Sequence, residues 1–257
     1  MKVIILAGGL GSRLGEMTEN IPKPMVKIGN KPIIWHIMKI YSHYNYNNFV
    51  ICLGYKAEII KDYFYHYEIK NNDFTIDLSN QNLQFHNKFS EPNWQVTLID
   101  TGLNTLKGGR IKRVEKYLDP DINMLTYGDG VADINISDLV KFHKSHGKMI
   151  TITGVYPPAR FGEIIEEGGV VKVFYEKPQT SSGLINGGFI VFNNSFLDFL
   201  TPDENCDLEK GALEMLSAKG EVMVYRHKDN WECMDHERDV YHLNNLWKTN
   251  KAFWKVW

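Results

Sequence analysis

The chain has 257 residues and a formal net charge of -2, and 43% of its residues are apolar. This length can bury one large core, and the composition is that of an ordinary globular protein. Lys and Arg are dispersed, which argues against nucleic-acid binding, and no apolar stretch reaches the length of a membrane span. The cysteines are few and far apart, which predicts a reducing, cytoplasmic setting without a disulfide framework.

Strands and helices alternate along the chain. Buried strands are predicted where β-branched and aliphatic residues run together, and helices where apolar residues recur every three or four positions. Strands are expected at residues 2–7, 48–54, 95–102, 122–130 and 149–157, with helices at 31–44, 56–67, 108–118 and 138–148 between them. This alternation predicts right-handed βαβ units around a mostly parallel sheet. A helix, a strand and a closing helix follow within 207–251.

Two stretches, 71–95 and about 160–192, interrupt the alternation with short strands and turns. We therefore predict an α/β protein with a Rossmann-like three-layer αβα architecture, a mostly parallel mixed sheet and a small β-rich lobe. Residues 1–257 would form a single domain with the two stretches as excursions. On the helix at 138–148, His143 and His146 are expected to face solvent.

A glycine-rich loop, "AGGLGSRL", follows the first strand. Bare backbone N–H groups between a strand and a helix bind phosphates. The loop fits neither the dinucleotide fingerprint, because Leu14 replaces its third glycine, nor the P-loop, because Ser12 and Arg13 follow Gly11. Arg13 instead adds a permanent cation, and Lys23 follows between two prolines that fix its backbone. The pattern predicts a polyphosphate site, with a tight turn and a solvated lysine as the alternative.

Asp129 in "TYGDG" and Asp235 in "ECMDH" are candidate metal ligands. Open α/β sheets bind ligands at the carboxyl ends of their strands, and Mg²⁺ is held by one or two carboxylates together with substrate phosphates. The aspartates therefore predict a Mg²⁺ site. A hairpin turn at Asp129 and a helix N-cap at Asp235 are the alternatives. A structural zinc site at Cys233, Asp235 and His236 is disfavoured, because such close spacing suits it poorly.

Polar residues also stand at two later strand ends. Glu176 and Lys177 lie in "FYEKP", and Asn186 precedes a double glycine in "INGGF". Lys177 can pair with a second phosphate, while Glu176 and Asn186 offer acceptors and donors to a hydroxyl-rich ligand. Ordinary surface residues at strand ends are the alternative.

Together these motifs resemble the sugar-phosphate nucleotidyltransferases. The signature is "LAGGLGSRL" followed by "PKPM", and the similarity continues through "GGRIKRV", "YGDGVAD", "EKP", "INGGFIVF" and "MDHERD". It runs essentially from end to end and is closest to members that use CTP and glucose 1-phosphate. Departures from the family pattern fall around the expected acceptor pocket, at Glu163, Glu232, Cys233 and His236.

The resemblance implies roles for individual residues. Lys23 and Arg13 would be catalytic, and Asp129 and Asp235 would hold Mg²⁺. The nucleotide would be bound by Leu6, Ala7, Gly8, Gly9, Gly11, Ser12, Asn104, Gly109, Arg110 and Gly128. A β-rich sugar-binding lobe would hold the sugar phosphate through Gly162, Glu176, Lys177, Asn186 and Gly187.

The implied reaction is a Mg²⁺-dependent in-line displacement that transfers CMP from CTP to α-D-glucose 1-phosphate, giving CDP-glucose and pyrophosphate. The resemblance also implies a homo-oligomer, a hexamer, that supplies CDP-glucose for surface polysaccharide. Three alternatives stay open: a cytidylyltransferase for another phosphorylated acceptor, a UTP- or dTTP-dependent hexose-1-phosphate nucleotidyltransferase, and a non-catalytic regulator that binds sugar nucleotides. The joint presence of Arg13, Lys23 and both aspartates argues against the regulator.

Overall fold

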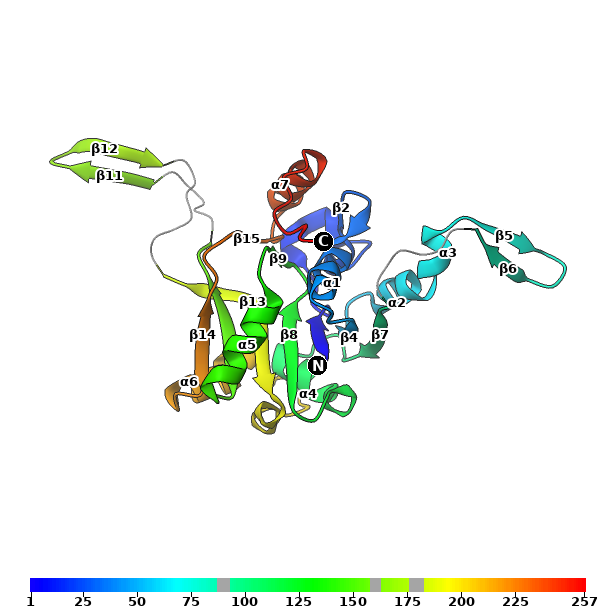
Figure 1. Ribbon diagram of the computed structural model, residues 1–257, viewed down its shortest axis with the longest axis horizontal. Helices are drawn as coiled ribbons and strands as arrows, with labels where there is room; N and C mark the ends of the chain where they lie inside the picture. The colour runs from blue at the N-terminus through cyan, green and yellow to red at the C-terminus, as the bar shows by residue number, and fades with distance from the viewer. Residues whose placement is uncertain (87–92, 158–162, 176–182) are drawn as a thin grey trace.

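The computed structural model describes residues 1–86, 93–157, 163–175 and 183–257. Its centre is a seven-stranded sheet with the strand order β14-β10-β13-β8-β1-β4-β7 (Figure 1). β1, β4, β7 and β8 run parallel, as do β10 and β14, whereas β13 is antiparallel to both its neighbours. The predicted mostly parallel mixed sheet is confirmed. The strands are β1 Val3–Leu6, β4 Asn48–Leu53, β7 Gln95–Asp100, β8 Ile122–Tyr127, β10 Ile150–Val155, β13 Ile185–Asn193 and β14 Val222–Arg226.

Helices cover both faces of the sheet, because the strands alternate their side chains between two cores. In β1, Val3 and Ile5 belong to one core and Ile4 to the other. The first core is packed by α1 Ile33–His43, α2 Ala57–Tyr65, α5 Ile136–His146 and α7 Glu237–Lys248, and the second by α4 Lys107–Arg113 and α6 Glu214–Ala218. These layers confirm the αβα prediction. Among the helices in the described ranges, none has the length and apolar character to cross a bilayer.

Two hairpins project from the body of the protein (Figure 1). β5 (Phe74–Asp77) pairs with β6 (Asn82–Phe85), and β11 (Glu163–Glu167) pairs with β12 (Val170–Tyr175). They fall within 71–95 and 160–192, whereas β13, at the end of the second stretch, joins the central sheet. The short helix α3 (Tyr67–Asn71) leads into the first hairpin, and smaller ribbons join β2 Lys27–Ile28 to β3 Lys31–Pro32 and β9 Gly130–Ala132 to β15 Trp231–Cys233.

The helix α5 buries one of the two histidines that were expected to face solvent. Its N-terminus is capped by Asn135, and Gly147 ends it with a φ of 68°. His143 is only 2% exposed, with Nδ1 2.9 Å from the Thr151 hydroxyl and Nε2 3.1 Å from Asn193 Oδ1. The expectation for His143 is therefore wrong, because β10 and β13 supply polar partners inside the core. His146 is half-buried, and its Nε2 lies 2.7 Å from the same threonine hydroxyl.

Candidate active site

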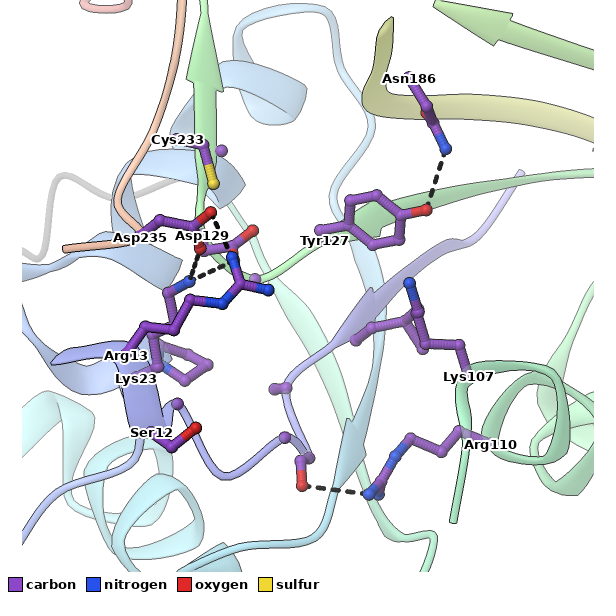
Figure 2. Close-up of a pocket in the computed structure, with 18 of the residues that line it drawn as sticks. Ser12, Arg13, Lys23, Lys107, Arg110, Tyr127, Asp129, Asn186, Cys233 and Asp235 are labelled. Atoms are coloured by element: carbon purple, nitrogen blue, oxygen red, sulfur yellow. Dashed lines mark hydrogen bonds and ion pairs between the residues drawn. The ribbon is translucent and has the colours of Figure 1, made fainter. Parts of the chain in front are cut away.

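A cavity of about 590 Å³ opens at the carboxyl ends of β1 and β8 (Figure 2). Open α/β sheets place their ligands at this edge, and the volume lies within the range of about 300–1,000 Å³ that is usual for small-molecule sites. The cavity wall includes most of the residues predicted to bind the nucleotide, namely Leu6, Ala7, Gly8, Gly9, Gly11, Ser12, Arg110 and Gly128.

Protein donors hold the carbonyl groups of the glycine-rich loop. The Gly8 carbonyl accepts hydrogen bonds from the Tyr55 backbone N–H and from Arg110 Nη2, both at 3.1 Å. A Cβ atom at Gly8 would lie 2.1 Å from Arg110 Nη1, so only glycine fits. Gly11 has a φ of 67°, and the Thr18 hydroxyl donates to its carbonyl at 3.1 Å. An anion repels carbonyl oxygens, so tying these two to protein donors favours phosphate in the cavity.

Lys23 lies between two aspartates that are far from it in the sequence. Its Nζ is 2.6 Å from Asp129 Oδ2 and 2.6 Å from Asp235 Oδ1, and its side chain is 14% exposed. Pro22 and Pro24 restrict the backbone on both sides. Burial by itself would lower the pKa of Lys23, but the two carboxylates outweigh it and raise that pKa above its ordinary value. Lys23 is therefore a fixed positive charge and not a proton donor.

The ribbon of β9 and β15 brings the two aspartates together. In this antiparallel pair Gly130 lies opposite Cys233, and the Met234 N–H donates to the Asp129 carbonyl at 2.9 Å. Asp129 precedes the first strand of the ribbon and Asp235 follows the second. The pairing thus joins residues from distant parts of the chain at one end of the cavity.

Both alternatives for the aspartates are wrong. Asp129 does not form the turn of a hairpin with β8, because the strand that follows it pairs with β15 instead. Asp235 is not the N-cap of α7, because His236 has that position. The Asp239 side chain accepts hydrogen bonds from the backbone N–H groups of both Asp235 and His236, at 3.0 and 2.7 Å. The Asp235 carboxylate is thereby left to face the cavity.

Arg13 completes a group of four charges. Its Nη1 is 2.7 Å from Asp235 Oδ2, and its side chain is 67% exposed. Burial opposes ionisation of Asp235, but Lys23 and then Arg13 overcome it and lower the pKa of the carboxyl. We call Arg13, Lys23, Asp129 and Asp235 the charge cluster. Its two cations and two anions balance, so a metal ion taking the anions would free the cations for phosphate.

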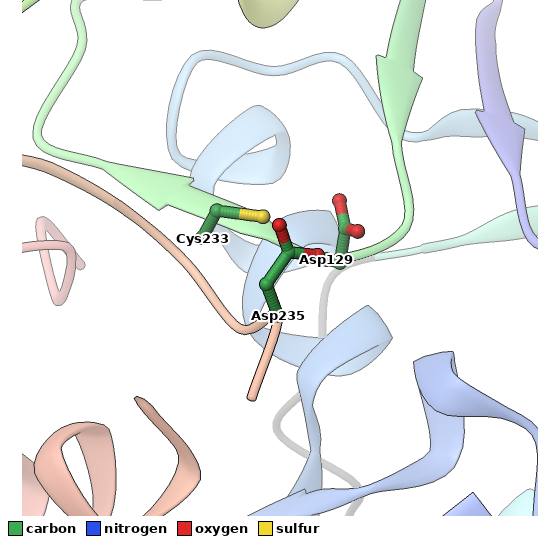
Figure 3. Close-up of side chains that lie close together, drawn as sticks. All are labelled: Asp129, Cys233 and Asp235. Carbon is green, nitrogen blue, oxygen red and sulfur yellow. The ribbon is translucent and has the colours of Figure 1, made fainter. Parts of the chain in front are cut away.

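The two aspartates of the charge cluster, together with Cys233, form a set of donor atoms that suits a metal ion. One ligand atom each of Asp129, Cys233 and Asp235 lies within 4.8 Å of the others (Figure 3). Two carboxylates that share a cavity with a phosphate-binding loop fit Mg²⁺, which takes its remaining ligands from phosphate and water. Burial, and after it the charge of Asp129, raise the pKa of the Cys233 thiol, so Cys233 is a neutral neighbour of the carboxylates.

The other end of the cavity carries hydrogen-bonding groups without excess charge. The Tyr127 hydroxyl donates to Glu209 at 2.8 Å and accepts from Asn186 Nδ2 at 3.0 Å. Lys107 pairs with the same glutamate, and its Nζ lies 5.0 Å from the centre of the Tyr127 ring. Burial and the Glu209 carboxylate raise the pKa of Tyr127, which keeps its hydroxyl protonated. Lys107, Tyr127, Asn186 and Gly187 line the cavity here, where they suit a hydroxyl-rich ligand.

A cavity that joins a glycine-rich loop to a cluster of cations and carboxylates suits nucleotidyl transfer. The family model of nucleotidyl transferases matches residues 2–255. The chain belongs to the nucleotidyl transferase family. The family predicted from the sequence is thereby confirmed.

Known proteins resemble this nucleotidyl transferase over its whole length. The glucose-1-phosphate cytidylyltransferases of Salmonella typhi and Salmonella typhimurium are each 46% identical to it over 258 residues, covering 100% of both chains. Among solved structures, the UDP-glucose pyrophosphorylase from Acinetobacter baumanii matches with a TM-score of 0.69 and 16% identity, covering 98% of this chain and 95% of that one. This structural match supports the fold alone.

Arg110 of this nucleotidyl transferase is 4% exposed and donates only to groups of the protein. Its five acceptors are the carbonyls of Gly8, Leu53, Gly102 and Leu103 and the hydroxyl of Thr101, at 2.7 to 3.1 Å. The guanidinium thus joins the loops that follow β1, β4 and β7. Its predicted contact with the nucleotide stays a prediction, whereas its hold on the cavity floor is direct.

The remaining predicted residues have different positions. Asn104 is exposed and Gly109 is buried, and neither lines the cavity. The Gly109 N–H donates to the Cys206 carbonyl at 3.0 Å, and a Cβ there would lie 2.3 Å from the Asp203 carbonyl, which explains the glycine. Three residues predicted to bind the sugar phosphate lie outside the described residues, namely Gly162, Glu176 and Lys177.

Two of the four departures from the family pattern, Glu232 and His236, do not line the cavity. Glu232 pairs with His242 at 2.9 Å, and His236 begins α7. Of Glu163 only the backbone, in β11, is described. Cys233 lines the cavity. The altered residues Glu232 and His236 are therefore part of the support behind the site and not part of its wall.

Several cavity residues were missed by the sequence analysis. Tyr127 and Trp231 stand beside the motifs that were used, and the Trp231 indole donates to the Gly187 carbonyl at 2.8 Å. Lys107 directly precedes "GGR", and a cation before a helix that opens toward a phosphate loop was a usable signal. The other missed residues are Pro24, Thr105, Leu106 and Gly130.

Proposed function

We propose that this nucleotidyl transferase transfers CMP from CTP to α-D-glucose 1-phosphate and releases CDP-glucose and pyrophosphate. The main observation in its favour is the position of Lys23 beside the glycine-rich loop. Its Nζ lies 2.6 Å from Asp129 Oδ2 and 2.6 Å from Asp235 Oδ1. The similarity to the glucose-1-phosphate cytidylyltransferases of Salmonella supports CTP and glucose 1-phosphate as substrates.

In the proposed reaction, a phosphate oxygen of glucose 1-phosphate forms a bond to the α-phosphorus of CTP. The bond from that phosphorus to the oxygen bridging it to the β-phosphate breaks, and pyrophosphate leaves with the electron pair. Lys23 and Arg13 reduce the repulsion between the two anions and stabilise the charge that builds on the α-phosphate. Asp129 and Asp235 would hold Mg²⁺, which would add further charge neutralisation. Catalysis is positioning and charge stabilisation, without a covalent enzyme intermediate.

The glucosyl group would bind at the end of the cavity where Lys107 is paired with Glu209 and no excess charge remains. Asn186 and Tyr127 offer a fixed donor and a fixed hydroxyl there, and Lys107 adds a cation close to Glu209. Because Glu232 is paired with His242 and does not line the cavity, it gives no support to a changed acceptor. We therefore favour glucose 1-phosphate over another phosphorylated acceptor.

The test is pyrophosphate release with Mg²⁺, crossing CTP, UTP, dTTP, ATP and GTP with glucose 1-phosphate and a panel of other phosphorylated sugars. We expect release with CTP and glucose 1-phosphate, and a sugar nucleotide of the mass of CDP-glucose. Release only with UTP or dTTP, or only with another acceptor, would replace the proposed substrates. If the protein binds sugar nucleotides but releases pyrophosphate with no pair of substrates, it is a non-catalytic regulator and not an enzyme.

We also propose that the chain acts as a single domain and assembles as a homo-oligomer, a hexamer. The family model covers 2–255, and the projecting hairpins expose apolar side chains, including Leu78 at 82% and Val170 at 59%. The three cysteines are free thiols, which fits a cytoplasmic enzyme supplying CDP-glucose for surface polysaccharide. Light scattering of the purified protein gives its mass, and a monomer at micromolar concentration contradicts the assembly.

A further inference from the structure

Cys233 shares the ribbon that positions both metal-binding aspartates. Its Sγ lies with one oxygen of Asp129 and one of Asp235 in a group whose atoms are all within 4.8 Å of one another, and Figure 3 shows the sulfur directed toward the carboxylates. The backbone fixes this arrangement, because Cys233 pairs with Gly130 and the Met234 N–H donates to the Asp129 carbonyl. The strand pairing therefore fixes the backbone of Cys233 beside both aspartates.

The spacing of the three atoms suits a single cation. Divalent metals bind thiolate sulfur at about 2.3 Å and carboxylate oxygen at about 2.0–2.2 Å, so two donors on opposite sides of one ion lie about 4.5 Å apart. Neighbouring donors lie closer than that. A set confined within 4.8 Å can therefore surround one ion after small side-chain rotations.

We propose that Cys233 is a third protein donor of the metal centre and gives it affinity for thiophilic cations such as Co²⁺, Zn²⁺ and Cd²⁺. The proposal rests on the proposed function, in which Asp129 and Asp235 hold the catalytic metal. Two carboxylates alone form a hard oxygen site that suits Mg²⁺, whereas a thiolate selects softer metals. On binding such a cation, the thiol sulfur bonds to the metal and its proton passes to solvent.

The net charge of the site indicates how a thiophilic cation would affect triphosphate binding. With Mg²⁺ and a neutral thiol, the ion, Lys23 and Arg13 carry four positive charges against two on the aspartates, which leaves two for the triphosphate. With a thiophilic ion and a thiolate, only one remains. Such a cation would therefore bind more tightly but support phosphate binding less well, and it would inhibit turnover in competition with Mg²⁺.

The other cysteines provide a matched control. Cys52 is buried, and its thiol lies 3.8 Å from the Arg110 carbonyl. The Cys206 thiol accepts from the Thr201 N–H at 3.4 Å and does not line the cavity. A metal effect that depends on Cys233 and not on Cys206 separates coordination in the cavity from ordinary thiol chemistry.

The test is a Co²⁺ titration of the full chain followed by absorption, because thiolate coordination to Co²⁺ gives a charge-transfer band in the near ultraviolet. We expect the band in the wild type and in Cys206→Ser, and its loss in Cys233→Ser. Competition with Cd²⁺ should show that Cys233→Ser lowers the ratio of Cd²⁺ to Mg²⁺ affinity by at least about tenfold.

Co²⁺ that binds the wild type without the band, or a band that persists in Cys233→Ser, would overturn the proposal. The wild-type spectrum is itself a test, so a variant that fails to fold does not remove it. Failure of the proposed function is separate, because it would appear as absent CDP-glucose formation with Mg²⁺ while the Co²⁺ spectrum is unchanged.

Discussion

The two cationic regions of the active site hold their charge in different ways. Arg110 donates to carbonyl and hydroxyl groups of the loops and strand ends around it. Lys23 and Arg13 instead pair with Asp129 and Asp235, which are themselves candidate metal ligands. Arg110 is thus bound to the scaffold, whereas the charge cluster is held by pairs that ligands can exchange.

This difference teaches that burial and charge alone do not identify a catalytic cation. Arg110 is more buried than Arg13, yet its acceptors give it a structural task. Hydrogen-bond partners decide the matter, because a cation whose partners also bind metal can be released to a substrate. The contrast predicts large losses of stability at Arg110 and large losses of turnover at Lys23.

The largest effect is expected for Arg110→Met, which keeps the aliphatic stem but removes the guanidinium donor from the Gly102 and Leu103 carbonyls and the Thr101 hydroxyl. The Gly8 and Leu53 carbonyls keep a backbone donor. Each buried polar group left without its hydrogen-bond partner costs about 1–3 kcal/mol, so the free energy of unfolding should fall by about 3 kcal/mol or more. Urea denaturation gives the value. Arg13→Met, at an exposed position, should change it by only about 0.5 kcal/mol. Equal losses of unfolding free energy in Arg110→Met and Arg13→Met would contradict the assignment of Arg110, but not Arg13, to the scaffold.

Lys23→Ala should affect chemistry more than folding. Turnover should fall at least about a hundredfold, the effect of losing a positioned charge in the transition state. At the same time Mn²⁺, followed by electron paramagnetic resonance without nucleotide, should bind more tightly, because the ammonium no longer competes for the two carboxylates. Lys27→Ala, on an exposed side chain of β2, is the control. Weaker Mn²⁺ binding in Lys23→Ala would mean that Lys23 supports the metal site instead of competing for it.

Asp129→Asn removes one of the two carboxylates that pair with Lys23 and are proposed to bind the metal ion. The Mg²⁺ concentration for half-maximal activity should rise about tenfold, since removing even an outer-shell partner costs 10–100-fold in metal affinity. A magnesium titration of initial rates measures this. Asp121→Asn, an exposed aspartate before β8, should titrate like the wild type. An unchanged titration in Asp129→Asn would remove that residue from the metal site.

The smallest effect is expected for the ion pair between His227 and Asp133, next to the ribbon of β9 and β15. His227 Nε2 lies 3.0 Å from Asp133 Oδ1, and the Asp133 N–H donates to the Asn230 carbonyl. Burial opposes protonation of His227, but Asp133 outweighs it and raises the pKa of the imidazole above 6.5. The pair therefore stabilises fully below pH 6.5, and this contribution is lost as the pH rises through the raised pKa.

His227→Gln should accordingly lower the free energy of unfolding by about 1 kcal/mol at pH 6 and by less at pH 9. Urea denaturation at the two pH values measures the difference. Since this pair lies outside the cavity, it belongs with Arg110 in the scaffold, and Mg²⁺ binding should change little. A loss that grows toward pH 9 would reverse the assigned charge state.

The central strands and the place of the glycine-rich loop could be predicted because their causes are local. Strands such as β4 are buried on both faces and read as continuous apolar runs, and a loop that must approach phosphate needs glycine. Lys23 was recognisable from the prolines beside it. In each case the signal lies within a few residues of the feature.

The partners of side chains could not be predicted in the same way. Nothing near Arg110 in the sequence says that its guanidinium meets the ends of three strands. His143 looked solvated on a lysine-flanked helix, but Thr151 and Asn193, which satisfy it inside the core, come later in the chain. The place of Cys233 beside both aspartates depends on the pairing of β9 with β15, which short-range patterns do not reveal.

The ion pair between Lys23 and Asp235 joins residues 212 positions apart. During synthesis the N-terminal strands and helices can begin to fold as they leave the ribosome, at about 5–20 residues per second. The charge cluster cannot close until Asp235 has been added. A nascent chain therefore carries its glycine-rich loop and an unmatched lysine before the charge cluster is complete, and the cluster forms only when nearly all of these residues have been made.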